Sequence, residues 1–459
     1  MAEAGVRPPG RAWPVWEIAA LAAITLVALL LRAHDLAAAP LFLDNEDELQ
    51  FAWAGLGLIE HGDAYTWSYF PAYGGVSPLH LFGASFPMVH HWMDHPPLYS
   101  LLVGGWVWLL GDRRLQDVSA VQVRVVPVLC STLTIPLLHL LARSVVGRAP
   151  GLLSAALLAT APAAVLLGRE SEPESAQAVL LLLALLATWR LLHGGGTGRW
   201  VAVLVACALL APAMKVSGIA VGVICGVILL AERRLWLAVW AGAGVLGGLA
   251  IYVLYGALTD WTLFLQVVLS QSQNRLDVLT AIAFLADPTG VNRSLHDGWW
   301  LLGWLGLGVC ALVGGRRQRL FLVWPAAAYA ATILILAGTK QTAQYGWYKV
   351  IVYPELYLAA GILAWTALRR SSLGLLTLLL VLGGATATNW WFAGPTGGWV
   401  PNPILLVLLL VLALGPAALT RWGARWRTLA RWVGGVAMSV LLVGNATESW
   451  ILSMIFTRM

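Results

Sequence analysis

Long apolar runs recur along the whole chain, and they constrain its fold more than any other feature. Segments within these runs, such as 178–189, 373–383 and 404–414, contain no charged residue. A helix that spans a bilayer needs about 20 predominantly apolar residues. Only 11% of the 459 residues are charged, whereas a soluble domain carries roughly 25%. Because a water-soluble fold of this size cannot bury so much apolar surface, the sequence predicts a protein that crosses a membrane many times.

Basic clusters between the apolar runs predict the orientation of the spans, because arginine and lysine accumulate in cytoplasmic loops. The clusters are Arg7/Arg11, Arg143/Arg148, Arg190/Arg199, Arg233/Arg234, Arg316/Arg317/Arg319, Arg369/Arg370 and Arg421/Arg425/Arg427/Arg431. If all of them are cytoplasmic, two crossings separate each cluster from the next. The membrane surface accounts for the net charge of +6, so we expect the lipid bilayer, and no nucleic acid, as a partner.

The stretch between the first two clusters decides the number of spans. It contains three apolar runs, 16–31, 98–110 and 121–141, and three crossings would place the second cluster outside. The middle run is short and follows two prolines, so we expect it to form a helix along the membrane surface. The sequence thus predicts an all-α polytopic membrane protein with about 13 transmembrane helices and interfacial helices in the first outer loop.

This topology gathers polar residues on one side of the membrane. Residues 1–370 are expected to form one transmembrane module with outer loops at 33–120, 168–174, 258–297 and 338–349, followed by C-terminal transmembrane helices at 371–459. A transporter more often places ionisable residues near the bilayer midplane, which is almost bare here. The pattern therefore favours a reaction at the outer interface.

The four cysteines do not indicate a metal site. Cys130, Cys207, Cys225 and Cys310 all fall inside apolar runs, and their spacing is not that of metal ligands. We expect them to be buried free thiols.

The first outer loop begins with an acidic cluster, Asp44-Asn45-Glu46-Asp47-Glu48, which precedes a short helical segment that ends at Gly62. Asp44 or Asn45 could cap this helix, and carboxylates favour its positive end. Four carboxylates within five residues exceed what capping requires. Like charges this close raise one another's pKa, which is one way to make a general base.

A second polar element, Asp94-His95-Pro96-Pro97, lies later in the same loop. The two prolines fix an extended entry to the surface helix. A histidine in such a place is more often a structural hydrogen-bonding residue. Its position on the same outer loop as Asp47 nevertheless favours a functional role for His95.

The loop at 168–174 contains three glutamates and one arginine. Pro173 suits the first turn of the next helix, and Glu172 and Glu174 would lie at the positive end of that helix. Capping explains these two residues better than it explains Arg169 and Glu170, which are therefore candidates for a site.

A fourth element combines cations with aromatic rings. It runs from Lys340 through Tyr345 and Tyr348 to Lys349. Such residues are ordinary anchors at a membrane interface. They are also the residue types that can hold a phosphate leaving group.

The order of these elements resembles the GT-C superfamily of membrane glycosyltransferases, especially its protein O-mannosyltransferase-like and aminoarabinose-transferase-like branches. The matching pieces are Asp47-Glu48 after the first span, His95 to Tyr99 before a surface helix, Val123-Arg124-Val125 at the second span, Gly168-Arg169-Glu170 after the third, and Tyr348 to Pro354 before a late span. The resemblance covers roughly residues 15–370. It implies a GT-C-like fold and a sugar donor linked to a polyprenyl phosphate, in keeping with the absence of a recognisable nucleotide-sugar site.

The resemblance also implies catalytic roles. Asp47 matches the acidic residue of the first loop that acts as the base, Glu48 is the second acid of that pattern, and Asp44 could be aligned in place of Asp47. Arg169 and Glu170 match the second-loop element. Relatives commonly have an aspartate a few residues later, where this chain has glutamates. No metal ligand is assigned for that reason, although a divalent cation stays open as a cofactor.

The remaining substrate-binding residues follow from their charge and from the resemblance. The departing phosphate is expected to be neutralised by Lys340, Lys349, Arg169 or Arg275. His95 would orient the acceptor or the phosphate, and Tyr345 and Tyr348 would line the same site. The predicted activity is a single inverting displacement onto an acceptor hydroxyl of a glycan, lipid or protein. The predicted location is the plasma (inner) membrane, with the active site on the periplasmic or extracellular face.

Two other classes of function stay open at this stage. One is a ligase that moves a whole glycan, or another transferase of a lipid-linked group. The other is a transporter of a lipid or small solute. The length of the transferred group separates the first class from a glycosyltransferase, and flux across sealed vesicles without chemical change would indicate the second.

Overall fold

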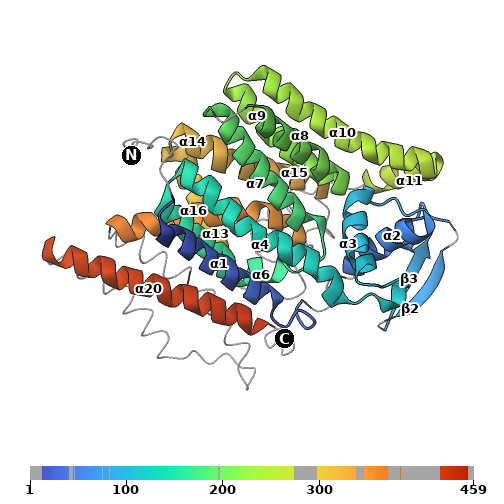
Figure 1. Cartoon of the computed structure of the whole chain (residues 1–459), viewed down its shortest axis with the longest axis horizontal. Coiled ribbons are helices and arrows are strands. Elements are labelled where there is room, and N and C mark those ends of the chain that lie inside the picture. The colour runs from blue at the N-terminus through green and yellow to red at the C-terminus, as the bar shows by residue number, and fades with distance from the viewer. Residues whose placement is uncertain are drawn as a thin grey trace.

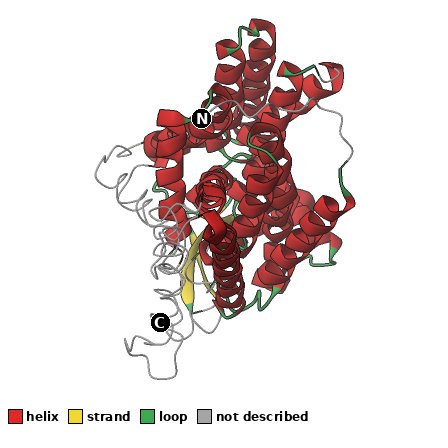
Figure 2. Cartoon of the chain, turned by 90° about the vertical axis from the view of Figure 1, so that its left-hand side faces the viewer, coloured by secondary structure: helices red, strands yellow, loops and turns green. Residues whose placement is uncertain are grey.

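The computed structural model describes residues 13–40, 45, 47–74, 76–81, 83–194, 197–272, 297–337, 346–370, 383 and 424–452. Within these residues the chain is a bundle of helices with one small sheet at its edge (Figures 1 and 2). The predicted predominance of helix is therefore confirmed for the described part of the chain.

Among the described residues, five helical segments are long and apolar enough to cross a membrane. They are α1 (Val15–Ala33), α4 (Ala120–Val145), α7 (Pro173–Leu192), α10 (Leu235–Thr259) and the continuous segment of η6 (Gly346–Val352) and α16 (Tyr353–Arg370). Shorter apolar helices are α8 (Thr197–Met214), α9 (Ile219–Ala231), α13 (Gly298–Val313) and α15 (Trp324–Ala337). The chain is a multi-pass membrane protein, but the predicted total of about 13 spans includes residues 371–423, of which only 383 is among the described residues.

Prolines and short turns divide several of the apolar segments. Helix α5 (Arg148–Thr160) ends just before Pro162, which begins α6 (Pro162–Leu167). Proline has no backbone N–H to continue a helix, but it fits the first turn of a new one. The other short elements are η2 (Leu115–Asp117), η3 (Val216–Gly218), α14 (Arg316–Gln318) and η4 (Arg319–Val323). Near the C-terminus, α20 (Ala424–Trp450) packs against α5 and α6.

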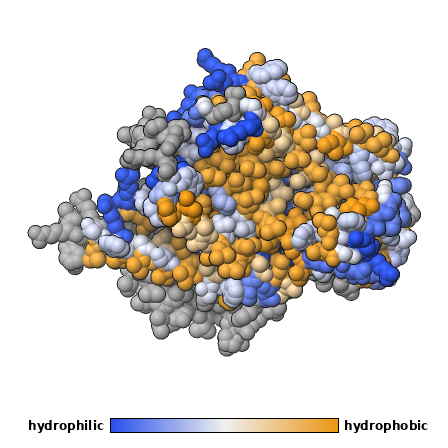
Figure 3. Space-filling model, viewed as in Figure 1, coloured by the Kyte–Doolittle hydropathy of each residue, from blue (hydrophilic) through white to orange (hydrophobic). Residues whose placement is uncertain are grey.

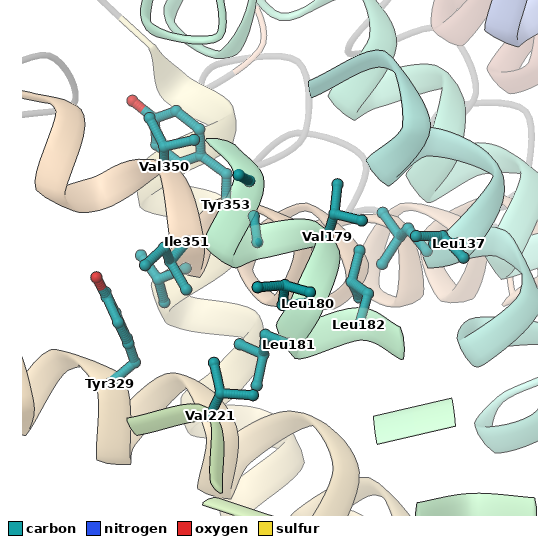
Figure 4. Close-up of a cluster of buried hydrophobic side chains, with 14 of the residues drawn as sticks. Leu137, Val179, Leu180, Leu181, Leu182, Val221, Tyr329, Val350, Ile351 and Tyr353 are labelled. Atoms are coloured by element: carbon teal, nitrogen blue, oxygen red, sulfur yellow. The ribbon is translucent and has the colours of Figure 1, made fainter. Parts of the chain in front are cut away.

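Helix α7 is buried on all sides within the bundle. It contacts α4, α8, α9 and η6. Figure 4 shows Val179 to Leu182 of α7 among side chains such as Leu137 of α4, Val221 of α9 and Ile351 of η6. A helix that is apolar all round is one that is fully buried, which explains why the sequence of α7 has no polar stripe. The face of the bundle in Figure 3 is broadly apolar, with hydrophilic side chains at the end that holds the sheet and also at the opposite end.

The segment between α1 and α4, which was expected to be the first outer loop, folds into a small domain at the end that holds the sheet (Figure 1), here called the outer domain. It contains the two predicted interfacial helices, α2 (Asp47–His61) and α3 (Pro97–Leu109). Helix α3 has 13 residues, too few to cross a bilayer, as expected from its proline-flanked run.

The prediction of an all-α fold is wrong in one respect, because this domain also contains a three-stranded antiparallel sheet. Its strands are β1 (Thr66–Trp67), β2 (Ser77–Leu81) and β3 (Ala84–Val89), in the order β1-β3-β2. Gly83 makes the turn between β2 and β3 with a φ of 79°, and Pro78 lies opposite Pro87 in the register. Two prolines in such short segments hid the strands, since proline argues against a strand that is hydrogen-bonded on both sides.

Two glycines allow α2 and α3 to pack backbone against backbone. A Cβ on Gly55 would lie 1.8 Å from the carbonyl oxygen of Ser100, and a Cβ on Gly104 would lie 2.5 Å from the carbonyl carbon of Gly55. No side chain fits at either position unless the helices separate. This contact holds the start of α2 beside the start of α3.

We expect Gly104→Ala to destabilise the outer domain by about 2 kcal/mol or more, because overpacking a close contact displaces the backbone. The matched control is Gly105→Ala, whose Cβ would lie 3.8 Å from Ile59; it should be neutral or gain up to about 1 kcal/mol from helix propensity. Thermal unfolding in detergent and protease protection of residues 47–110 measure both variants. Equal stability of the two would contradict the close contact.

Candidate functional site

The carboxylate of Asp47 lies at the first position of α2, at the amino end of the helix. Its side chain is half-buried. Asp44 and Glu46 lie outside the described residues. The intervening Asn45 is buried and donates a hydrogen bond from Nδ2 to Oε2 of Glu170 at 3.3 Å. The acidic start of α2 is thus in contact with the loop before α7, as the predicted topology requires.

The neighbouring Glu48 forms a buried ion pair with Arg124 of α4. The guanidinium donates from Nη2 to Oε2 at 2.6 Å and from Nε to Oε1 at 2.9 Å, and neither side chain is exposed. The backbone N–H of Ser171 donates to the same carboxylate at 3.1 Å, and Arg124 also donates to the carbonyl of Leu36 at 2.6 Å. Both oxygens of Glu48 are therefore engaged in joining α2, α4 and the loop before α7.

The glutamates of the second loop surround a lysine from a different loop. Lys215, between α8 and η3, lies 2.7 Å from Glu174 and 3.5 Å from Glu172. Its ammonium group also lies 4.4 Å from the ring centroid of Tyr348. Burial alone would lower the pKa of Lys215, but Glu174, Tyr348 and Glu172 raise it above its ordinary value, so this lysine stays charged.

The ionisation of Glu172 depends on the charged groups around it. Burial raises the pKa of its carboxyl well above the ordinary value, and although Lys215 opposes the rise, Glu174, Asp47 and Glu170 add to it. Asp47 and Glu170 therefore lie close enough to Glu172 to influence its ionisation. Like charges close together in a poorly solvated place disfavour further ionisation.

The ring of His95 lies in a cluster of aromatic side chains. It stacks on Phe51 with ring centroids 5.3 Å apart and meets Trp92 edge-on at 5.6 Å. Phe51 is one turn after Asp47, and residues four apart share a face of a helix. The histidine is therefore held on the face of α2 that carries Asp47.

Asp94 is a buried carboxylate beside the same face of α2. Burial raises the pKa of Asp94 to about 7, with a further contribution from Asp47 and against hydrogen bonds from Ser68, Tyr73 and Trp92. The Tyr73 hydroxyl donates to Oδ1 of Asp94 at 2.8 Å. Through these hydrogen bonds, Asp94 anchors the chain just before His95.

The guanidinium of Arg169 is directed at backbone carbonyls. It donates to the carbonyl of Ala39 at 3.1 Å and to that of Leu31 at the end of α1. Burial and the nearby Arg124 lower the pKa of Arg169 to about 10. A cation at the carboxyl end of a helix compensates the partial negative charge of its last carbonyls, so Arg169 ties the second loop to α1 in this structure.

The remaining predicted residues divide between described and undescribed segments. Tyr348 and Lys349 lie on η6, which contacts α7, and Lys349 is buried. Arg275, Lys340 and Tyr345 lie outside the described residues. The described outer segments therefore bring together Asp47, His95, Glu170 and Tyr348 from four different parts of the sequence.

Lys215 was not among the predicted site residues, although it joins Glu172, Glu174 and Tyr348. The signal for it in the sequence was a single charged residue between two apolar runs. An isolated lysine in a short outer turn resembles an interfacial anchor, and only the structure shows the carboxylates that surround it. Asp94 was likewise passed over in favour of His95.

The described residues do not offer a metal site. No group of three histidine, cysteine, aspartate or glutamate side chains among them could hold a metal ion, and the four cysteines are free thiols.

The raised pKa of Asp94 predicts a specific dependence of stability on pH. From about pH 4 to about pH 7 this carboxyl is protonated in the folded chain and ionised in the unfolded one, so the folded state binds more protons and loses stability as pH rises. Asp94→Asn keeps an oxygen to accept from Tyr73 and removes this loss. We expect its melting temperature relative to the wild type to rise across this window and to level off above it.

Apparent melting temperatures in detergent between pH 4 and 8 measure the effect, and Asp117→Asn, an exposed acid of the same loop, is the control. Parallel profiles for Asp94→Asn and the wild type would contradict a raised pKa.

Comparison with known proteins gives one family match and several structural matches. The family described as dolichyl-phosphate-mannose-protein mannosyltransferase matches residues 94–255, which begin at Asp94. No curated protein matches the chain.

Two similar structures are of ArnT from Cupriavidus metallidurans. The form bound to undecaprenyl phosphate has a TM-score of 0.59 and 17% identity, and covers 97% of this chain and 79% of that chain. The apo form has a TM-score of 0.59 and 16% identity, and covers 96% of this chain and 77% of that chain. At such identity the likeness is one of fold.

Proposed function

We propose that this chain, which has the fold of the GT-C superfamily of membrane glycosyltransferases, transfers a sugar from a polyprenyl-phosphate donor to an acceptor hydroxyl on the non-cytoplasmic face. The observation that carries the proposal is the convergence of Asp47, His95 and the loop of Glu170 at one end of the helices. Each comes from a segment that the distribution of arginines assigns to the outside. The plasma membrane is proposed as the location.

Asp47 is proposed as the general base. It is half-buried at the amino end of α2, on the face of that helix that holds the ring of His95, and the resemblance assigns the base to this position. In the proposed step the acceptor oxygen attacks the anomeric carbon, the bond from that carbon to the phosphate oxygen breaks, and the polyprenyl phosphate leaves with the electron pair. Asp47 takes the proton of the acceptor hydroxyl. One displacement of this kind inverts the anomeric configuration and needs no covalent intermediate.

The charge on the leaving phosphate calls for nearby cations. We assign this role to the buried Lys349 of η6, together with Lys340 and Arg275 from segments outside the described residues. Arg169, in the loop before α7, stays a further candidate. Charged donors aimed at a departing phosphate stabilise the transition state.

The polyprenyl chain of the donor is inferred from the membrane environment and from a structural match. The ArnT structure is bound to undecaprenyl phosphate, and we extend that lipid class to this chain. A lipid carrier suits a site at the ends of apolar helices, because its tail can stay in the bilayer while its phosphate reaches the outer interface.

The test of the proposal is release of polyprenyl phosphate by the purified protein from a panel of polyprenyl-phosphate sugars. Asp47→Asn should lower turnover by at least about 100-fold, which is the lower range for loss of a general base, while the melting temperature stays close to that of the wild type. Asp117→Asn should keep normal turnover. Near-normal turnover of Asp47→Asn would end its assignment as the base, and no release from any donor of the panel would end the proposed function.

A further inference from the structure

Three consecutive backbone carbonyls just before His95 each accept a hydrogen bond from a side chain of the same helix pair. Tyr255 donates to Trp92 at 2.8 Å, Tyr252 donates to Met93 at 2.7 Å, and Gln271 donates to Asp94 at 2.7 Å. The two tyrosines belong to α10, and Gln271 belongs to α11 (Trp261–Ser272).

The same segment is also fixed from the side of the sheet. The N–H of Met93 donates to the Tyr73 hydroxyl at 2.8 Å, and that hydroxyl donates to Asp94. The N–H of Trp92 donates to the carbonyl of Ala64 at 2.9 Å. Every backbone carbonyl and two backbone amides of residues 92–94 therefore have a defined partner.

The helix pair that holds this segment is itself closely packed. Phe264 of α11 packs edge-on against Tyr252 with ring centroids 4.9 Å apart. Helix α10 lies close against α8, because a Cβ on Gly248 would lie 2.2 Å from the carbonyl oxygen of Leu209. Since α8 leads directly into Lys215, one packed unit is connected to both sides of the site.

We propose that Tyr252, Tyr255 and Gln271 are positioning residues, which act on the reaction by holding residues 92–94 so that His95 stays stacked on Phe51 beside Asp47. The predicted effect on turnover rests on the proposed function, whereas the predicted effect on the structure of residues 92–94 does not. None of the three residues is assigned to the site by the sequence or by the comparisons.

The three hydrogen bonds are not needed merely to join α10 to the outer domain. The apolar cluster of Met93, Tyr252 and Phe264 already provides such a contact. Hydroxyl and amide donors aimed at successive carbonyls instead fix the path of the backbone, and the next residue along that path is His95. Small displacements of a group that orients a substrate lower the rate steeply.

The test compares Tyr252→Phe/Tyr255→Phe, and separately Gln271→Met, with Tyr65→Phe. These changes keep the rings or the side-chain length and remove only the donors. Tyr65 lies in the same outer domain, and its hydroxyl has no hydrogen-bond partner among the described contacts, so its loss is a matched control. Hydrogen exchange of the peptide that contains residues 92–95 should accelerate at least about tenfold in the double variant and stay unchanged in Tyr65→Phe.

Turnover is measured in the same variants and in a His95→Ala background. If the donors act through His95, the double variant should lose about tenfold or more in kcat on its own and little further in the His95→Ala background, since residues that act as a unit are not additive. Fully multiplicative losses, unchanged exchange, or turnover equal to that of Tyr65→Phe would overturn the proposal. If the wild type transfers no sugar, the proposed function fails, and the exchange rates alone decide whether the donors hold the segment.

Discussion

The buried ion pair of Glu48 and Arg124 is the interaction on which the candidate site most depends. It joins α2 to α4, and through the N–H of Ser171 it also fixes the loop before α7. Removing one partner of such a pair typically costs about 3–5 kcal/mol, because the other charge stays buried without compensation. The carboxylate next to it along the chain, Asp47, is left half-buried at the amino end of α2. The ion pair thus helps to place the proposed base.

A second buried network serves the opposite side of the site. Lys215 balances Glu174 and Glu172, and Tyr348 covers its ammonium group. These residues come from three separated segments, so the network can form only when α7, α8 and η6 end at the same level. Buried charges are tolerated where they are paired, and here the pairing also holds the outer loops together. The membrane helices therefore set the geometry of the site through charges at their ends as well as through apolar packing.

The sequence predicted the membrane class, the short helix expected at 98–110, and the gathering of the loops at 33–120, 168–174 and 338–349, as far as they are described, because these depend on local patterns of charge and apolar length. It did not predict what individual charged side chains would contact. The role expected for Glu48 beside Asp47 stays a prediction, and its contacts with Arg124 and Ser171 could not be read from the sequence. The role expected for Arg169 near a phosphate also stays a prediction, and its hydrogen bonds to the carbonyls of Leu31 and Ala39 were not foreseen. Lys215 was missed because its contacts are with residues distant in the chain. The strands were missed because two prolines obscured their sequence pattern.

The side of the membrane on which Asp47 lies decides whether a lipid-linked donor can reach it as proposed. Labelling with a membrane-impermeant thiol reagent in right-side-out vesicles tests this directly, with Tyr69→Cys as the exposed position of the outer domain and Arg317→Cys as the exposed position in an arginine cluster. The unmodified chain, whose described cysteines are buried or half-buried, is the control. Labelling of Tyr69→Cys in intact vesicles, and of Arg317→Cys only after permeabilisation, is the predicted result. The reverse pattern, or labelling of both from the same side, would contradict the account.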